Sequence, residues 1–103
     1  MTKINLPDDF NRFEDIDDQI NETKVTGFNY KNFVTFAIYQ RPKDASIKFK
    51  LLNTDLYEKM DYDDQRTYSR YIRLNDESDK INKMQVDKII ELCEYLYNKY
   101  KEN

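Results

Sequence analysis

Phe33-Val-Thr-Phe-Ala-Ile-Tyr39 and Ser46-Ile-Lys-Phe-Lys-Leu51 are two short apolar runs, and the polar segment Gln40-Arg-Pro-Lys-Asp-Ala45 joins them. Two strand-like runs with a short polar connection between them are typical of a β-hairpin. In the first run, apolar residues occupy both alternating faces, which predicts an interior strand buried on both sides. In the second run, Ile, Phe and Leu alternate with Ser and Lys, which predicts one core face and one wet, basic face. We therefore expect the rest of the chain to be arranged around this hairpin.

The composition is that of one small globular domain with an aromatic core. The chain has 103 residues, of which 39% are hydrophobic and 36% charged, with nine Tyr, six Phe, one Gly and two Pro. A chain of this length folds as one domain and buries roughly 65% of the surface that its unfolded form exposes. Its apolar residues are concentrated in periodic segments, unlike those of a disordered chain. We expect a single α+β domain over residues 1–103.

The N-terminal region has apolar residues at the spacing of a helix. They are separated by three, three and four residues, which predicts an amphipathic helix over residues 7–23 with Pro7 in its first turn. The members of this stripe are Phe10, Phe13, Ile16 and Ile20. The remaining positions are strongly acidic, and we expect them to form the solvated outer face of the helix.

A second helical stripe, near the C-terminus, predicts a long helix that covers one face of the sheet. Asn82 and Gln85 have the spacing of a capping box, which places the start of this helix. Apolar residues then recur every three or four positions almost to the end of the chain. They are Val86, Ile89, Ile90, Cys93, Leu96, Tyr97 and Tyr100.

Shorter segments complete the predicted fold. Residues 24–30 have the composition of a strand, in which the lone Gly27 indicates a bulge or a close approach of another segment. Residues 55–60 are predicted as a short helix, 61–65 as a polar loop and 67–74 as a fourth strand. The fold class that we expect is α+β: an antiparallel sheet of three to four strands, with an N-terminal helix, a short middle helix and a long C-terminal helix packed on it.

The residue inventory offers little for catalysis or metal binding. Histidine is absent, and the single thiol, Cys93, lies within the apolar stripe of the C-terminal helix. A thiol in such a place is expected to be a buried, inert part of the core. The acidic residues 61–64 lack the glycine turn and closing glutamate of a calcium loop, and one glycine cannot form a glycine-rich phosphate loop. We expect no catalytic residue, no cofactor and no metal site.

Cysteine content and the N-terminal residues predict a reducing compartment. One cysteine cannot form a disulfide framework within the chain, whereas small secreted domains usually have paired cysteines. No apolar run is long enough for a signal peptide or a membrane span. We therefore expect a cytoplasmic protein that does not bind a membrane.

Charge is segregated along the chain. Formal charges are −4 for residues 1–24, +4 for 25–53, −4 for 54–79 and +1 for 80–103, within a net charge of −3. The basic segment contains the central hairpin, and acidic segments flank it. Either these opposite charges neutralise one another within the domain or across a dimer, or they form surfaces for partners.

Four hydrophobic tracts have the order of a known type of domain. They are Asn32-Phe-Val-Thr-Phe36, Ile47-Lys-Phe-Lys-Leu51, Tyr71-Ile-Arg-Leu74 and Ile89-Ile-Glu-Leu-Cys-Glu-Tyr95. Over residues 13–100, this pattern resembles the small double-wing (MmcQ-like) α+β domains. The resemblance implies a sheet-and-wing surface that binds DNA or protein, and it implies no active site.

Our preferred hypothesis is a non-enzymatic module that acts by protein–protein contact. It would be a phage-type or mobile-element-type regulator or inhibitor of a host protein that acts on nucleic acid or in defence. The predicted surface combines carboxylates with exposed tyrosines as aromatic anchors. Its residues are Asp15, Asp18, Tyr57, Asp61, Tyr62 and Asp64. The module is expected to be a monomer or a homodimer.

The alternative hypothesis is a nucleic-acid-binding module that uses the basic face of the sheet. Cations beside exposed tyrosines are typical of surfaces that contact phosphates and stack bases. The residues predicted for this role are Lys48, Lys50, Arg70 and Arg73. A pI near 5.0 counts against this alternative, because nucleic-acid binders are usually strongly basic.

Overall fold

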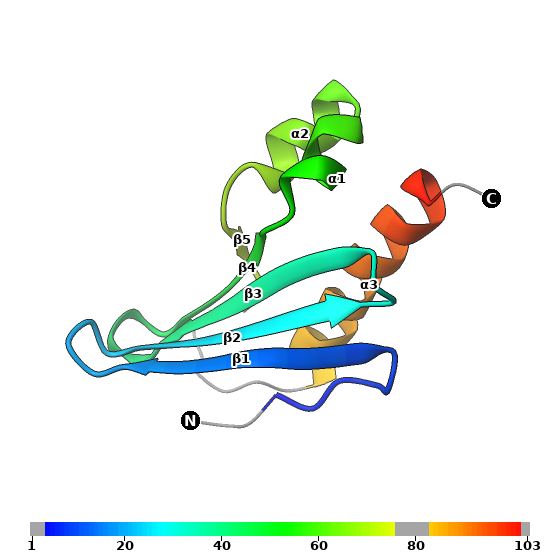
Figure 1. Ribbon diagram of the computed structural model, residues 1–103. Helices are drawn as coiled ribbons and strands as arrows, with labels where there is room; N and C mark the ends of the chain where they lie inside the picture. The colour runs from blue at the N-terminus through cyan, green and yellow to red at the C-terminus, as the bar shows by residue number, and fades with distance from the viewer. Residues whose placement is uncertain (1–3, 76–82, 102–103) are drawn as a thin grey trace.

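An antiparallel sheet with its strands in chain order is the frame of the protein (Figure 1). The computed structural model describes residues 4–75 and 83–101, and across these residues the strand order is β1-β2-β3-β4-β5. The strands are β1 (Phe10–Asp18), β2 (Thr23–Tyr30), β3 (Val34–Arg41), β4 (Ser46–Leu51) and β5 (Ile72–Arg73). The helices are the 3₁₀ turn η1 (Pro42–Asp44), α1 (Thr54–Lys59), α2 (Tyr62–Tyr68) and α3 (Lys83–Tyr100). The predicted α+β class and long C-terminal helix are confirmed, with five strands in this part of the chain in place of three to four.

The central hairpin predicted from the sequence is formed by β3 and β4. Its register pairs Phe36 with Leu51 and Ile38 with Phe49, and η1 joins the two strands. Val34, Phe36 and Ile38 are fully buried on one face of β3. The alternation of apolar residues therefore directs this face of the hairpin into the core.

The second face of β3 is less buried than the sequence predicts. Ala37 is buried there, but Thr35 and Tyr39 are only half-buried. The prediction of burial on both faces is therefore only half right. The physical reason is that no helix of the described residues lies over this second face (Figure 1).

The core is a stack of aromatic rings covered by α3. The ring of Phe36 is stacked on the rings of Phe49 and Phe28, with centroids 4.8 and 5.6 Å away. The predicted apolar stripe of α3 covers this stack, and Ile89 and Cys93 are fully buried within it. Burial raises the pKa of the Cys93 thiol well above its ordinary value. The prediction that Cys93 is a core residue is confirmed.

The predicted N-terminal helix is wrong, because residues Phe10–Asp18 form strand β1, which pairs with β2. A β-bulge at Phe13 explains the helix-like spacing, since the extra residue shifts the alternation of the strand by one position. Phe10 points into the core, whereas Phe13 and Ile16 lie on the opposite face of the sheet. A stripe that fits one helix face is thus divided between two faces of a strand. Pairing along β2 outweighs the local helix pattern.

Two further segments differ from the sequence prediction. The predicted loop 61–65 lies mostly in α2, because Asp61 caps this helix and its Oδ1 accepts a hydrogen bond from the Asp64 N–H at 2.9 Å. The predicted strand 67–74 is reduced to β5, since its first residues complete α2. The short middle helix is confirmed as α1, and the predicted N-cap of α3, Asn82, lies outside the described residues.

Two asparagines hold the central hairpin to the segments that follow it. Asn53, just before α1, accepts a hydrogen bond from the Thr35 N–H at 3.3 Å and donates one to the Phe33 carbonyl at 2.9 Å. Asn75, just after β5, accepts one from the Ile47 N–H at 2.9 Å. These side chains replace backbone partners that the strand ends lack. They therefore fix the start of α1 and the end of β5 against the hairpin.

Replacing Phe36 by Ala should remove the centre of the aromatic stack. We expect the free energy of unfolding to fall by about 3–5 kcal/mol, because a large cavity is left among buried neighbours. This is a large part of the roughly 5–15 kcal/mol typical of a small domain. Urea denaturation measures the change, with Ile20→Ala as the control, since Ile20 is 94% exposed. A loss below about 1 kcal/mol for Phe36→Ala would contradict this account of the core.

Candidate binding surface

One face of the sheet is uncovered in the described residues. α3 packs on the face that carries Phe36, and the opposite face, which we call the open face, has no helix over it (Figure 1). The strand registers place on the open face the side chains that alternate with the core residues. They are Asn11, Phe13, Glu14, Ile16 and Asp18 on β1, Thr23, Val25, Gly27 and Asn29 on β2, Thr35, Ala37, Tyr39 and Arg41 on β3, Ser46, Lys48 and Lys50 on β4, and Arg73 on β5.

The middle of the open face has a floor of small residues. Gly27 and Ala37 are paired across β2 and β3, and the ring of Phe13 lies over Gly27. A Cβ atom at position 27 would lie only 2.7 Å from Cζ of Phe13. The lone glycine therefore marks a close approach, as predicted, while the bulge itself is in the neighbouring strand β1. Phe13 and Ile16 remain 53% and 44% exposed.

A pair of tyrosines borders the basic side of the open face. The rings of Tyr39 and Tyr71 meet edge to face, with centroids 5.0 Å apart, and Tyr71 is 47% exposed. The Nζ atoms of Lys50 and Lys48 lie 5.5 and 6.0 Å from the Tyr71 centroid, within the range of a cation–π interaction. Burial, with a further effect from Tyr71, raises the pKa of Tyr39 above its ordinary value. The Tyr39 hydroxyl therefore stays protonated at neutral pH.

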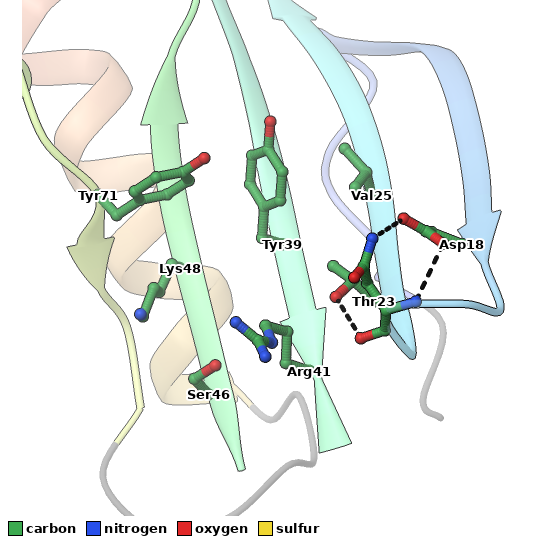
Figure 2. A pocket seen from close by; sticks show the side chains of 9 residues that line it. Asp18, Thr23, Val25, Tyr39, Arg41, Ser46, Lys48 and Tyr71 are labelled. Carbon is green, nitrogen blue, oxygen red and sulfur yellow. Dashed lines mark hydrogen bonds between the residues drawn. The ribbon is translucent and has the colours of Figure 1, made fainter. Parts of the chain in front are cut away.

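A pocket of about 350 Å³ lies at the end of the open face (Figure 2). Its lining combines hydroxyl and amide groups with one carboxylate and two cations. The lining residues are Asp18, Asn21, Thr23, Val25, Tyr39, Arg41, Ser46, Lys48 and Tyr71. The side-chain amide of Asn21 donates to Asp18 at 2.8 Å and lowers the pKa of this carboxyl. The Asp18 carboxylate already accepts hydrogen bonds from Ile20 and Asn21 in the turn after β1. The cations Arg41 and Lys48 therefore make the pocket suited to an acidic or polar side chain.

The structure does not bring together the six acidic and aromatic residues predicted for protein contact. Asp15 and Asp18 lie on β1 at one edge of the sheet, whereas the other four belong to segment 57–64, beyond β4 (Figure 1). Tyr62 is 73% exposed, but Tyr57 is half-buried against the core. The predicted exposure is therefore observed for Tyr62 and not for Tyr57, and a role of Tyr62 as an anchor stays a prediction.

Asp61 and Asp64 are bound to the C-terminal end of α3. The ammonium group of Lys99 donates to Asp61 at 2.6 Å and to Asp64 at 3.0 Å. The hydroxyl groups of Tyr95 and Tyr100 donate to Asp64 at 3.0 and 2.5 Å, and Asp64 is only 8% exposed. The hydrogen bond with Lys99 lowers the pKa of Asp61 below its ordinary value. The two carboxylates thus tie α2 to α3, a structural role that the sequence does not indicate.

Two of the four basic residues predicted for nucleic-acid binding, Lys48 and Lys50, lie beside the ring of Tyr71. Lys48 and Arg73 are paired across β4 and β5, Lys50 lies near the ring of Tyr71, and Arg70 lines a groove beside this ring. Lys50 and Arg73 each donate a hydrogen bond to a backbone carbonyl, at 3.1 and 2.8 Å. The contact with Ser69 holds Lys50 beside the ring of Tyr71, whereas the guanidinium of Arg73 is turned to the carbonyls of Asn75 and Ala45.

The apolar part of the open face is not evident from the sequence. Phe13 and Ile16 fit a helix stripe, and Tyr39 fits a buried face of an interior strand, so neither pattern indicates an exposed surface. The one signal that points to this face is Gly27. A lone glycine in a strand indicates that something lies close above the backbone.

Comparisons with known proteins give no match: no protein family, no curated protein and no solved structure matches this chain. The resemblance to the double-wing domains therefore stays a prediction. Within residues 4–75 and 83–101, none of the helices is long and apolar enough to span a membrane. Across the same residues, no three acidic or thiol side chains are grouped so as to hold a metal ion.

Replacing Lys99 by Met should weaken the tie between α2 and α3. In the folded protein, the pKa of Asp61 lies below its ordinary value of 3.8. The contact of Asp61 with Lys99 therefore stabilises the fold fully above pH 3.8, and this stabilisation is lost as the pH falls through the folded pKa. We expect the variant to be less stable than the wild type near pH 7, and the difference to shrink below about pH 4. Urea denaturation near pH 7 and below about pH 4 measures the difference in the free energy of unfolding. Lys83→Met is the control, because Lys83 forms an exposed pair with Asp87. A difference that does not depend on pH would count against the role of Asp61.

Proposed function

We propose that this protein is a binding module and that it holds a partner protein against the open face of its sheet. The observation that carries the proposal is that exposed rings and charges of both signs share one uncovered face. Exposed apolar side chains gathered on a sheet, such as Phe13, Ile16 and Tyr71, are characteristic of interaction surfaces. Tyrosine and arginine are also among the residues that most often supply binding energy in protein interfaces.

The distribution of charge favours a protein over a polyanion as the partner. Glu14 and Asp18 lie on the β1 side of the open face, and Arg41, Lys48 and Lys50 lie on the side of β3 and β4. A phosphate backbone that crossed the whole face would be repelled along β1. A protein surface, by contrast, can present basic groups opposite β1 and acidic groups opposite β4.

A module of this kind acts by occupying a surface of its partner. A phage-type or mobile-element-type protein that regulates or inhibits a host protein works by such occupancy, and we extend the proposal to this mode of action. The size of the open face allows such occupancy. Strands lie about 4.8 Å apart in a sheet, so the open face is comparable in area with the roughly 800 Å² that each partner contributes to a standard interface.

Substituting Phe13→Ser together with Tyr71→Ser should remove two exposed rings without opening the core. The wild-type chain is used to capture proteins from a lysate of its native host. We expect the variant to retain about tenfold less, or an even smaller amount, of at least one of these proteins. Quantitative mass spectrometry of the retained proteins measures the loss. The matched control is Tyr62→Ser with Met84→Ser, which removes two exposed apolar side chains from α2 and α3.

The retained protein is then purified, and calorimetry measures its affinity for the wild type and for both variants. Thermal unfolding shows beforehand that each variant is folded. Equal affinity for the wild type and the variant of Phe13 and Tyr71 would contradict the proposal. So would a loss of binding that occurs only in the control variant.

A second candidate function, the binding of single-stranded nucleic acid, is favoured by one observation. Lys48 and Lys50 lie beside the exposed ring of Tyr71, an arrangement that provides phosphate contacts and base stacking, and two further cations are close to Tyr71 in the chain. The four cations are Lys48, Lys50, Arg70 and Arg73. The arrangement covers only the side of the open face formed by β4 and β5.

Fluorescence anisotropy with labelled single-stranded oligonucleotides tests this second candidate. We expect binding at low salt that weakens steeply as salt rises, and a loss of about tenfold or more on Lys48→Glu with Lys50→Glu. The control is Lys59→Glu with Lys83→Glu, which makes the same charge change on α1 and α3. If no complex forms at low salt, or if both variants lose affinity equally, this face is not a nucleic-acid site.

A further inference from the structure

Strand β1 has one paired edge and one unpaired edge. It is the first strand of the sheet, and β2 is its only neighbour within the described residues. Other backbone hydrogen bonds at this end of the sheet join the Phe10 N–H to the Pro7 carbonyl and the Lys31 N–H to the Asp9 carbonyl. Along residues 11–18, the outward N–H and C=O groups therefore have no backbone partner in the described part of the chain. Such an edge is a template for an added strand.

The side chains of β1 are accessible on both faces of the sheet. Every residue from 11 to 17 is exposed, although the segment before β1 packs against the core beside Phe10 with Ile4 and Leu6. With nine residues, β1 is also the longest strand in the described part of the chain. An added segment would thus find a long, open edge with room for its side chains above and below.

The side chains of β1 are mainly acidic. Its formal charge is −3, from one arginine and four carboxylates, which are Glu14, Asp15, Asp17 and Asp18. Among the ion pairs of the described residues, one involves this strand: Lys24 lies 3.7 Å from Asp15, and both side chains are partly exposed. A partly exposed pair at this distance offsets little of the negative charge.

This charge determines which kind of strand the edge accepts. Natural edge strands carry charged side chains that oppose pairing with identical edges. Two copies of β1 side by side would bring carboxylates close to carboxylates, and like charges across neighbouring strands are unfavourable. A segment rich in Lys or Arg meets the same edge with opposite charges.

We propose that the free edge of β1 adds a strand from an extended, Lys- or Arg-rich segment of a partner protein. Main-chain hydrogen bonds of the added strand supply affinity, and the alternation of its side chains supplies selectivity. On the open face its cations meet Glu14 and Asp18, and on the other face they meet Asp15 and Asp17. The added strand also widens the open face beside Ile16.

Two of the four carboxylates at this edge lie off the open face. Asp15 and Asp17 are paired with Thr26 and Lys24, whose side chains lie on the α3 side of the sheet. Substitutions of these two carboxylates therefore leave the open face unchanged. Edge pairing and open-face binding consequently succeed or fail independently in experiments.

A synthetic peptide tests the edge directly. The probe is a capped peptide of about eight residues in which pairs of Lys are separated by single Val residues, so that Lys lies on both faces of the added strand. A matched probe has N-methyl groups on two adjacent central residues, which block hydrogen bonds on both of its edges. Binding to the full chain is followed by NMR and by amide hydrogen exchange. We expect signals of residues 11–18 to shift, their exchange to slow by about tenfold or more, and the methylated probe to bind about tenfold more weakly.

Charge variants complete the test. Asp15→Lys with Asp17→Lys should weaken binding of the unmethylated probe by about tenfold or more. Glu58→Lys with Asp63→Lys makes the same charge change on α1 and α2, at the other side of the sheet, and should leave the affinity within about twofold.

Several outcomes would overturn the proposal. Equal binding of the methylated and unmethylated probes would mean attraction by charge without strand pairing. NMR shifts confined to residues of the open face would mean that the peptide does not bind at the edge of β1. No binding at about 1 mM peptide in low salt, or dimerisation through β1, would exclude a basic strand as the occupant.

Discussion

The stacking of Phe36 between Phe28 and Phe49, beneath α3, is the contact on which the rest of the structure depends. It requires the observed register of β2, β3 and β4, because a slip of one residue would turn these rings away from the helix. Once α3 covers this face, the alternate side chains of the same strands point to the opposite one. The open face, with the rings of Tyr39 and Tyr71 on it, is therefore a direct consequence of how the core is built.

Carboxylates in this chain have different roles because of where the fold places them. Asp61 and Asp64 lie beside the end of α3, where Lys99 binds both of them, so they hold helices together. Asp15 and Asp17 lie on an unpaired strand edge, where one weak ion pair offsets little of their charge. Negative charge is thus structural at one end of the molecule and available for contact at the other.

Local patterns predict much of this fold. The alternation of β4 and the stripe of α3 each have the period of a single element, so both elements are found from the sequence. Strand β1 is not found from the sequence, because the bulge at Phe13 gives its apolar residues the spacing of a helix. Helix α2 is missed because its residues form no apolar stripe, and because the contact of Asp64 with Lys99 joins residues that are far apart in the chain.

By itself, the sequence determined the α+β class, the central hairpin, the burial of Cys93 and the segregation of charge, because these depend on residue type and on the period of single segments. It also singled out Lys48 and Lys50, but it did not show that both lie beside the ring of Tyr71. Only the tertiary structure decided that Phe13 and Tyr39 share an uncovered face, and that the acidic residues divide between a strand edge and a helix clamp. These arrangements depend on strand register and on the packing of α3, which bring together residues that are distant in the chain.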